Sequence, residues 1–141
     1  MSKEEVINRI INEHRLIEGM LYDSINVILS YSMESIYDQE DEFRRQVSRF
    51  LDNFKKLKEP HYQFEESSFF PLLPSQYRGV VEDLVNEHGL IIKLIGEVMN
   101  ALMESNFKSV LGLLRKVYDI GVSHMKKENE LIKVLQSETK I

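Results

Sequence analysis

The chain has 141 residues, a formal net charge of −5 and no cysteine. This length suffices for one domain with its own hydrophobic core, so we expect a single domain over residues 1–141. The acidic balance and the scattered lysines argue against a nucleic-acid-binding surface, and the lack of cysteine excludes disulfides, thiolate nucleophiles and zinc–thiolate sites.

Apolar runs in the chain are short. None approaches the roughly 20 apolar residues of a membrane-spanning helix. The start, MSKEEVINRI, lacks the basic and apolar regions of a signal peptide. We therefore expect a cytoplasmic protein that does not bind membranes.

The first predicted helix begins at Ser2, which forms a capping-box pattern with Glu5. Apolar residues then recur at steps of three and four, the spacing of one buried helix face. The pattern fades at residues 31–37, where we expect the helix to end. The predicted inward positions are Ile7, Ile10, His14, Ile17, Leu21, Ile25 and Ile28.

Three further stretches show the same spacing. The second runs from Phe43 to Ser68 and stops at Pro71, the third follows a predicted cap at Ser75 and runs to Leu102, and the fourth runs from Phe107 to Leu135. Amphipathic helices joined by short loops pack antiparallel with their apolar faces inward. The sequence thus predicts an all-α protein, an up-down-up-down four-helix bundle.

All four histidines of the chain fall on these inward faces. A single inward histidine is more often a hydrogen-bonded core residue than a ligand, but four out of four would occur by chance roughly one time in thirty. Counting about 1.5 Å per residue from the helix ends places all four in one layer of the bundle. The four are His14, His61, His88 and His124.

Two glutamates share these faces, because Glu65 and Glu128 follow His61 and His124 by four residues. A single such pair is commonly a surface ion pair. Buried carboxylates, however, need a cation, and no lysine or arginine lies at that level of the inward faces. A metal is the simplest cation to expect here. Six ligands suit two metals that share both carboxylates, and nitrogen and oxygen donors suit iron, manganese or zinc.

The spacing differs from that of ferritin-like di-iron proteins, which use Glu-x-x-His. It resembles the hemerythrin-like (HHE cation-binding) family over essentially the whole chain. The motifs that carry this resemblance are NEH at 12–14, HxxxEE at 61–66 followed by FFP at 69–71, EH at 87–88 and HxxxE at 124–128.

The resemblance implies a four-helix bundle around two iron ions joined by an oxo or hydroxo group, with manganese or zinc as less favoured metals. It implies that His14 and His61 bind one iron and that His88 and His124 bind the other. Glu65 and Glu128 would bridge the two irons.

Two positions depart from the oxygen-carrying members of the family. Ile92 stands where these carriers have a second histidine one turn after the helix 3 ligand, and we expect it on the inward face. Asn129 stands where they have an aspartate ligand. Both departures resemble the branch linked to stress response and repair of iron centres, although the cysteine-bearing N-terminal domain of many repair members is absent.

The function that we predict is binding of, or reaction with, a small oxidant, either dioxygen, peroxide or nitric oxide, with a redox partner to supply electrons. An alternative is an iron storage or delivery module without diatomic chemistry, and a third is an interaction module with structural histidines. Whether the protein is an enzyme stays open.

Several neighbours of the histidines have less definite roles. Glu18, Tyr22 and Tyr118 are further candidates for the site. Gly121 predicts either a ligand pocket or close helix packing, and Glu13 and Glu87 are expected to face neighbouring helices or solvent.

Overall fold

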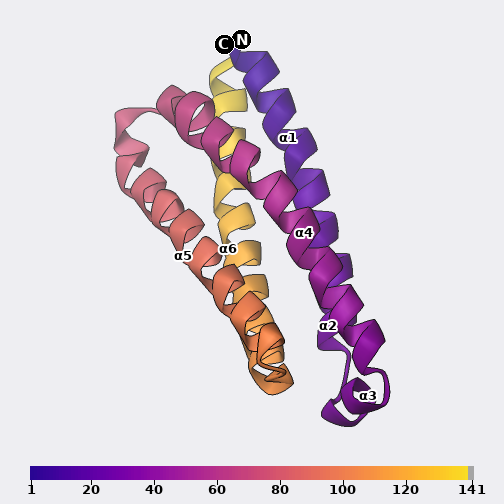
Figure 1. Cartoon of the computed structure of the whole chain (residues 1–141). Helices are drawn as coiled ribbons and strands as arrows, with labels where there is room; N and C mark the ends of the chain where they lie inside the picture. Colours follow the sequence, from indigo (N-terminus) through magenta and orange to yellow (C-terminus); the bar gives the residue numbers. More distant parts are fainter. Residues whose placement is uncertain (140–141) are drawn as a thin grey trace.

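The computed structural model describes residues 1–139 (Figure 1). Within this range every regular element is helical and there is no strand, so the predicted all-α class is confirmed. The longer helices are α1 (Lys3–Gly19), α4 (Glu40–Phe64), α5 (Arg78–Met103) and α6 (Phe107–Thr139), and the shorter ones are α2 (Asn26–Leu29) and α3 (Met33–Asp38).

Four short segments complete the chain path. Two are π-helical, η1 (Met20–Ile25) and η2 (Glu65–Phe69), and two are 3-10 helices, η3 (Phe70–Leu72) and η4 (Ser75–Tyr77). The backbone stays helical through η1, so α1, η1 and α2 form one continuous rod. In the same way η2 prolongs α4.

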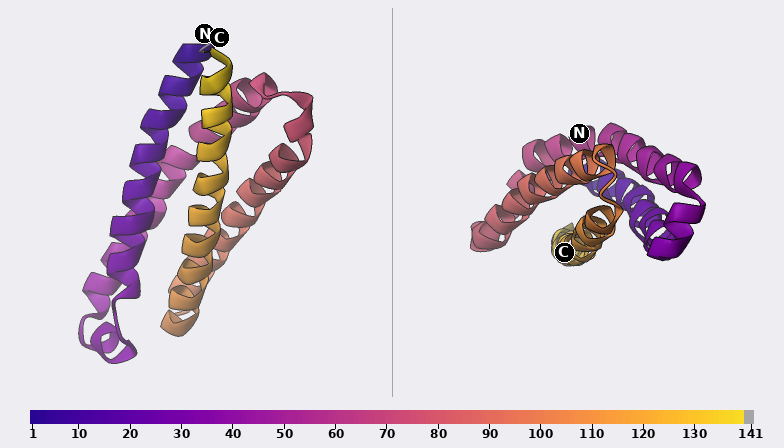
Figure 2. Two further views of the ribbon diagram at one scale, coloured as in Figure 1. Left: turned by 180° about the vertical axis from the view of Figure 1, so that it is seen from behind. Right: turned by 60° about the horizontal axis from the view of Figure 1, so that its bottom comes forward.

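Both ends of the described chain lie at the same end of the molecule. In Figure 1, α1 leads away from this end, α4 returns to it, α5 leads away again and α6 comes back. Figure 2 shows α1 and the last part of α6 side by side, and an ion pair of 3.2 Å joins Lys3 Nζ to Glu138 Oε2. Among residues 1–139, no helix has the length and apolar character needed to cross a bilayer.

The boundaries of the helices differ from the prediction in two places. The first rod ends at Leu29, and residues 33–38 form the separate helix α3, which is capped by Ser32 and Ser35. Ser75 is not the cap of α5, because it begins the 3-10 turn η4 after Pro74, and α5 starts only at Arg78. The predicted cap at Ser2 is present, since its side chain accepts a hydrogen bond from the Glu5 N–H at 3.1 Å.

The buried side chains form two apolar clusters separated by a polar layer. The larger cluster holds buried residues within 21–54 and within 91–125. The smaller one lies nearer the termini and holds buried residues within 6–10, 64–84 and 131–135. Where the clusters meet, each long helix carries buried histidines or glutamates, and α4 also carries the buried Tyr62. The fold therefore places its polar groups in one layer across the middle of the core.

Candidate metal centre

Six polar side chains make up the buried layer, and none of them is more than 4% exposed. Each long helix contributes at least one of them, and η2 begins with another. No lysine or arginine in the described part of the chain forms an ion pair with either glutamate. The six are the residues predicted from the sequence, His14, His61, Glu65, His88, His124 and Glu128.

These side chains form two overlapping groups of four. The first group is His14, His61, Glu65 and Glu128, and the second is Glu65, His88, His124 and Glu128. Within each group, one nitrogen or oxygen from every residue lies within 4.8 Å of the others. Donors bound at about 2.1 Å from one metal ion lie at most about 4.2 Å apart, so each group is close to the size that one ion requires.

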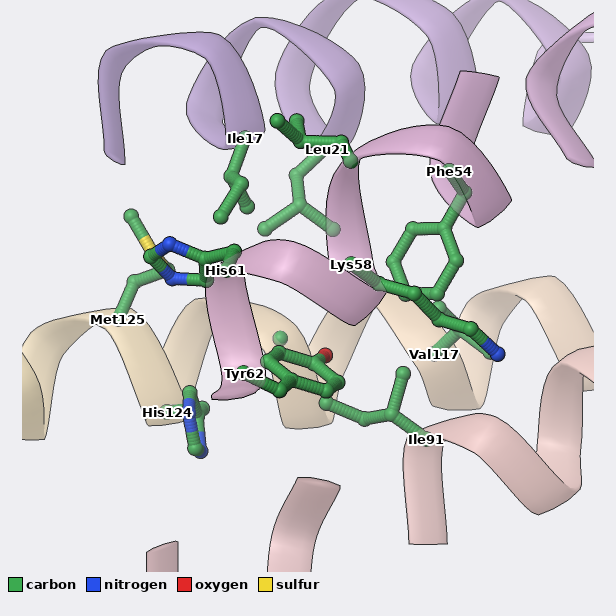
Figure 3. Close-up of a pocket in the computed structure, with 12 residues that line it drawn as sticks. Ile17, Leu21, Phe54, Lys58, His61, Tyr62, Ile91, Val117, His124 and Met125 are labelled. Carbon is green, nitrogen blue, oxygen red and sulfur yellow. The ribbon is translucent and has the colours of Figure 1, made fainter. Parts of the chain in front are cut away.

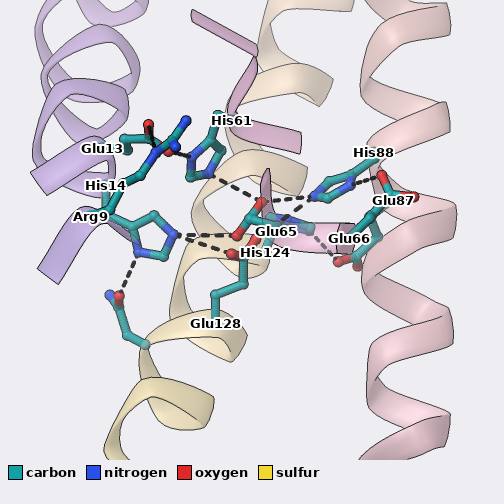
Figure 4. Close-up of polar contacts among 11 residues, drawn as sticks. Arg9, Glu13, His14, His61, Glu65, Glu66, Glu87, His88, His124 and Glu128 are labelled. Carbon is teal, nitrogen blue, oxygen red and sulfur yellow. Dashed lines mark hydrogen bonds and ion pairs between the residues drawn. The ribbon is translucent and has the colours of Figure 1, made fainter. Parts of the chain in front are cut away.

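The Nε2 atoms of the histidines converge on the two carboxylates (Figure 4). His61 Nε2 and His88 Nε2 each lie 3.1 Å from Glu65 Oε1. His14 Nε2 lies 3.1 Å from Glu128 Oε2, and His124 Nε2 contacts Glu128 Oε1. Each carboxylate therefore touches one histidine of either group, which is the position of a bridging ligand.

The Nδ1 atom of every histidine faces an oxygen on a neighbouring helix. These oxygens can only accept, so each Nδ1 carries the proton and donates it. The four pairs, from Nδ1 to the accepting oxygen, are His61 to Glu13 at 2.8 Å, His124 to Glu87 at 2.9 Å, His88 to Glu66 at 3.0 Å and His14 to Asn129 at 3.0 Å.

Most inner atoms of this layer lack a hydrogen-bond partner in the described part of the chain, although His14 Nε2 lies within hydrogen-bond distance of Glu128 Oε2, at 3.1 Å. With the proton on Nδ1, a neutral imidazole presents the lone pair of its Nε2 to a carboxylate oxygen, and two acceptors so close repel each other unless a metal ion or a second proton lies between them. Glu65 Oε1 and Oε2, His88 Nε2, His124 Nε2 and Glu128 Oε1 are buried without a hydrogen-bond partner among residues 1–139. Because unpartnered buried carboxylates are strongly destabilising, the residues present fit a metal ion in each group.

The surroundings also set the charges of the site. Burial raises the pKa of the Glu65 carboxyl, but contacts from His14, His61 and His88 outweigh burial and hold this pKa well below its usual range. Burial and the adjacent His88 lower the pKa of His124 to about 4. At neutral pH the layer thus holds an anionic carboxylate and a neutral imidazole, which are the forms that bind metals.

An apolar cavity of about 30 Å³ lies against the polar layer (Figure 3). One histidine of each group, His61 and His124, forms part of its wall. A water molecule needs about 10–15 Å³ of such space, so the cavity has room for one diatomic molecule. The rest of the wall is mainly apolar and includes Ile17, Leu21, Phe54, Ile91, Val117 and Met125.

Gly121 also lines the cavity, and a Cβ atom there would lie 2.9 Å from Leu21 Cδ2. The glycine therefore permits the close approach of η1 to α6 and leaves the cavity open at the same time. The two interpretations of Gly121 in the sequence do not exclude each other.

Tyr62 is the aromatic residue closest to the centre, and nothing in the helical pattern singled it out. Its ring stacks on His88 with a centroid distance of 3.8 Å and an interplanar angle of 9°, and it forms part of the cavity wall. Burial and the charge of Glu65 raise the pKa of Tyr62. The predicted tyrosines, Tyr22 and Tyr118, instead pack edge to face against each other at 6.0 Å and are not in that wall.

The expected inward position of Ile92 is wrong. Its side chain is 42% exposed and lines a groove between α4 and α5, whereas Ile91 is buried and lines the cavity. On α5 the buried residues next to His88 are Leu84, four before it, and Ile91, three after it, so the inward face runs along these positions and position 92 lies to one side of it. Glu18 is also partly exposed and belongs to neither group of ligands.

The role of four residues as acceptors for the histidine Nδ1 atoms was not assigned from the sequence. They are Glu13, Glu66, Glu87 and Asn129. Each one is the direct neighbour of a residue in the two groups. A neighbour lies about 100° around the helix, so it points toward the adjacent helix when the ligand points inward. The EH, EE and EN dipeptides were therefore the available signal, but the histidine that each would meet depends on how the helices pack.

Comparison with known proteins agrees with this geometry. The family model described as the hemerythrin HHE cation-binding domain matches residues 5–135. No curated protein and no solved structure matches the chain. The chain belongs to the hemerythrin HHE cation-binding domain family, whose members bind metal ions, typically iron.

Proposed function

We propose that this chain is a non-haem di-iron protein that binds or reacts with a small oxidant, which is dioxygen, peroxide or nitric oxide. His14 and His61 would hold one ion, His88 and His124 the other, and Glu65 and Glu128 would be shared. The observation that carries the proposal is the set of buried nitrogen and oxygen lone pairs that face one another without a donor between them.

The donor set and the family favour iron. Four imidazoles and two carboxylates without sulfur suit iron, manganese or zinc, and the family typically binds iron. When bound, an iron pair would supply accessible oxidation states and open coordination positions for a small ligand. The Nδ1 contacts would hold each imidazole in the tautomer and orientation that this binding needs.

The cavity supports a small, weakly polar ligand. It touches His61 and His124, so a molecule inside it would lie beside both proposed ions. Its size suits a diatomic molecule better than a larger organic substrate. The apolar wall would limit water near the ions. This favours reversible binding or slow reaction of the small ligand over its rapid hydrolysis.

Burial of the ligands argues against the alternative role in iron storage or delivery. Release of an ion would require the polar layer to open, because none of the six side chains is more than 4% exposed. The ions would therefore be retained as a cofactor.

Metal analysis tests the proposal. The protein, loaded anaerobically with ferrous iron and desalted, should contain about two irons per chain, and nitric oxide added to the reduced form should change its absorption spectrum. Substoichiometric mixed metal without any response to nitric oxide would favour storage or delivery. No bound iron would leave the histidines with a structural role alone.

We propose one domain over residues 1–141, an up-down-up-down arrangement of four long helical rods, a cytoplasmic location and an electron-donating partner. The alternating helix directions in Figure 1 support the arrangement.

A further inference from the structure

The four outer contacts of the histidines repeat in a cycle around the bundle. Glu13 and Glu87, which precede the histidines of α1 and α5, accept from the histidines of α4 and α6. Glu66 and Asn129, which follow the two shared glutamates, accept from His88 and His14. Each long helix, with η2 taken as the end of α4, thus provides one acceptor for the next.

One of the four acceptors differs in chemical type from the other three. Three of the acceptors are carboxylates, and the fourth is the amide oxygen of Asn129, which faces His14 at 3.0 Å. A carboxylate accepts a stronger hydrogen bond than a neutral amide does. It therefore makes the imidazole that donates to it a stronger ligand.

A cation lies beside one acceptor carboxylate in each group, so the cations leave the difference between Glu66 and Asn129 in place. Arg9 Nε lies 3.1 Å from Glu13 Oε2, and Lys127 Nζ lies 2.7 Å from Glu87 Oε2. Glu66 forms no ion pair with a lysine or arginine in the described part of the chain. Behind the histidines of the first group lie one carboxylate paired with a cation and one neutral amide. Behind those of the second group lie one carboxylate paired with a cation and one carboxylate without such a pair.

We propose that the two metal positions are unequal, and that the position of His88 and His124 binds a cation more tightly and better stabilises a ferric ion. Glu66 and Asn129 are the positioning residues that set this difference. The inference rests on the dinuclear centre proposed above. It adds that, in a reduced iron pair, the ion held by His88 and His124 would have the lower reduction potential.

Two matched variants test this order, Glu66→Gln and Glu13→Gln. Each replaces a carboxylate behind one histidine by an amide of the same shape, and Glu66 and Glu13 serve different groups. The metal-free proteins are titrated anaerobically with cobalt(II) against a chromophoric chelator. We expect two cobalt ions per wild-type chain, bound in unequal steps.

The two variants should act in opposite directions on this inequality. Glu66→Gln should weaken the tighter step by about tenfold or more and narrow the gap, whereas Glu13→Gln should weaken the looser step and widen it. A purely structural role would change both steps together, with a lower melting temperature of the metal-free protein. The same step weakened in both variants, or equal steps in the wild type, would overturn the inference.

The potential of the iron-loaded protein gives an independent readout. The first oxidation of the reduced pair should shift upward by about 60 mV for a tenfold effect in Glu66→Gln, and by much less in Glu13→Gln. Equal shifts in both variants would contradict the assignment. Fewer than two cobalt or iron ions in the wild type would contradict the dinuclear centre itself.

Discussion

Glu128 is the residue with the most direct consequence for the site. Its carboxylate contacts His14 of the first group and His124 of the second, and it is fully buried. Its loss would remove a ligand from both proposed metal positions, together with a negative charge that would balance the bound ions. The effect on metal binding should therefore exceed the ten- to hundredfold loss typical of an outer hydrogen-bond partner.

Glu128→Ala should consequently contain far less than two irons per chain and should melt at a lower temperature than the loaded wild type. Glu130→Ala is the matched control, because Glu130 is on the same helix with a largely exposed side chain that, within residues 1–139, pairs only with Lys133. Both variants are loaded identically and analysed for iron. Full metal content in Glu128→Ala would rule out the shared position of this carboxylate.

Gly121 on α6 allows the segment η1 to approach α6 closely beside the cavity. An added methyl group would lie 2.9 and 3.1 Å from the two terminal carbons of Leu21, which is buried. Overpacking of this kind costs about 1–3 kcal/mol, which exceeds the gain of about 1 kcal/mol for alanine over glycine within a helix. Gly112 on the same helix has no atom within 4 Å of such a methyl group.

We therefore expect Gly121→Ala to lower the free energy of unfolding by about 1 kcal/mol, and Gly112→Ala to raise it by up to about 1 kcal/mol. Urea unfolding of the two variants measures both changes. Gly121→Ala should also slow the reaction of the loaded protein with nitric oxide, because the methyl group occupies the cavity. An increase in stability in both variants would show that Leu21 moves aside freely.

Among the elements, the regular helices were predictable from the sequence, and the irregular turns were not. The steps of three and four residues fix which face of a long helix is buried, so the four long rods follow from the positions of the apolar residues. The wider turns η1 and η2 carry no comparable pattern. The end of the first rod and the start of α5 also depended on local hydrogen bonds around Ser32 and Pro74 that compete with helix continuation.

One side chain joins two elements far apart in the chain. Arg44 at the start of α4 donates to the Leu102 carbonyl at 3.0 Å and to Ser105 Oγ at 2.5 Å, and its guanidinium lies over the Phe107 ring. It thereby holds the turn between α5 and α6, where Ser105 has a positive φ of 59°. Arg45 beside it makes an exposed ion pair with Glu42.

Arg44→Ala should therefore lower the free energy of unfolding by about 1–2 kcal/mol through two lost hydrogen bonds, whereas Arg45→Ala should change it by less than about 0.5 kcal/mol. Chemical unfolding of both variants, followed by circular dichroism, makes the comparison. Equal effects would mean that the link between α4 and the turn adds no stability.

On the scale of the whole molecule, the polar layer was predictable because of its position on the helices. Histidines and glutamates at inward positions of equal height must meet wherever the helices run side by side, and the structure brings all six together. Which histidine meets Glu66 or Asn129, and whether Ile92 turns inward, depends on a rotation of a few tens of degrees about each helix axis. A repeat of apolar residues does not fix such an angle.

This layer makes the metal-free protein sensitive to acid. Burial lowers the pKa of His124 from 6.5 to about 4, so between these values the unfolded chain binds a proton that the folded chain does not. Stability is then lost as the pH falls from about 6.5 towards 4, by roughly 3 kcal/mol at most. Glu65 acts in the same direction below pH 4.5, since its pKa is held low in the folded state.

Unfolding of the metal-free protein in urea at several pH values between 7.5 and 4.5 measures this loss. His124→Gln should show a shallower dependence across the same range, because glutamine does not titrate. A wild-type stability that is constant over this range would contradict a neutral, buried His124.

Metal binding should couple the two apolar clusters that the layer separates. In the metal-free protein, repulsion between facing lone pairs weakens the middle of the core, whereas bound ions would join α1, α4, α5 and α6 through His14, His61, His88 and His124.

Because ions bind only the folded arrangement, stabilisation grows with the logarithm of metal concentration over its dissociation constant, about 2.7 kcal/mol at a hundredfold excess. Iron should therefore raise the melting temperature, and amide hydrogens near His88 and His124 should gain more protection from exchange than those near the turn at Ser105. Identical melting curves with and without iron at neutral pH would mean that the two clusters hold the fold together without it.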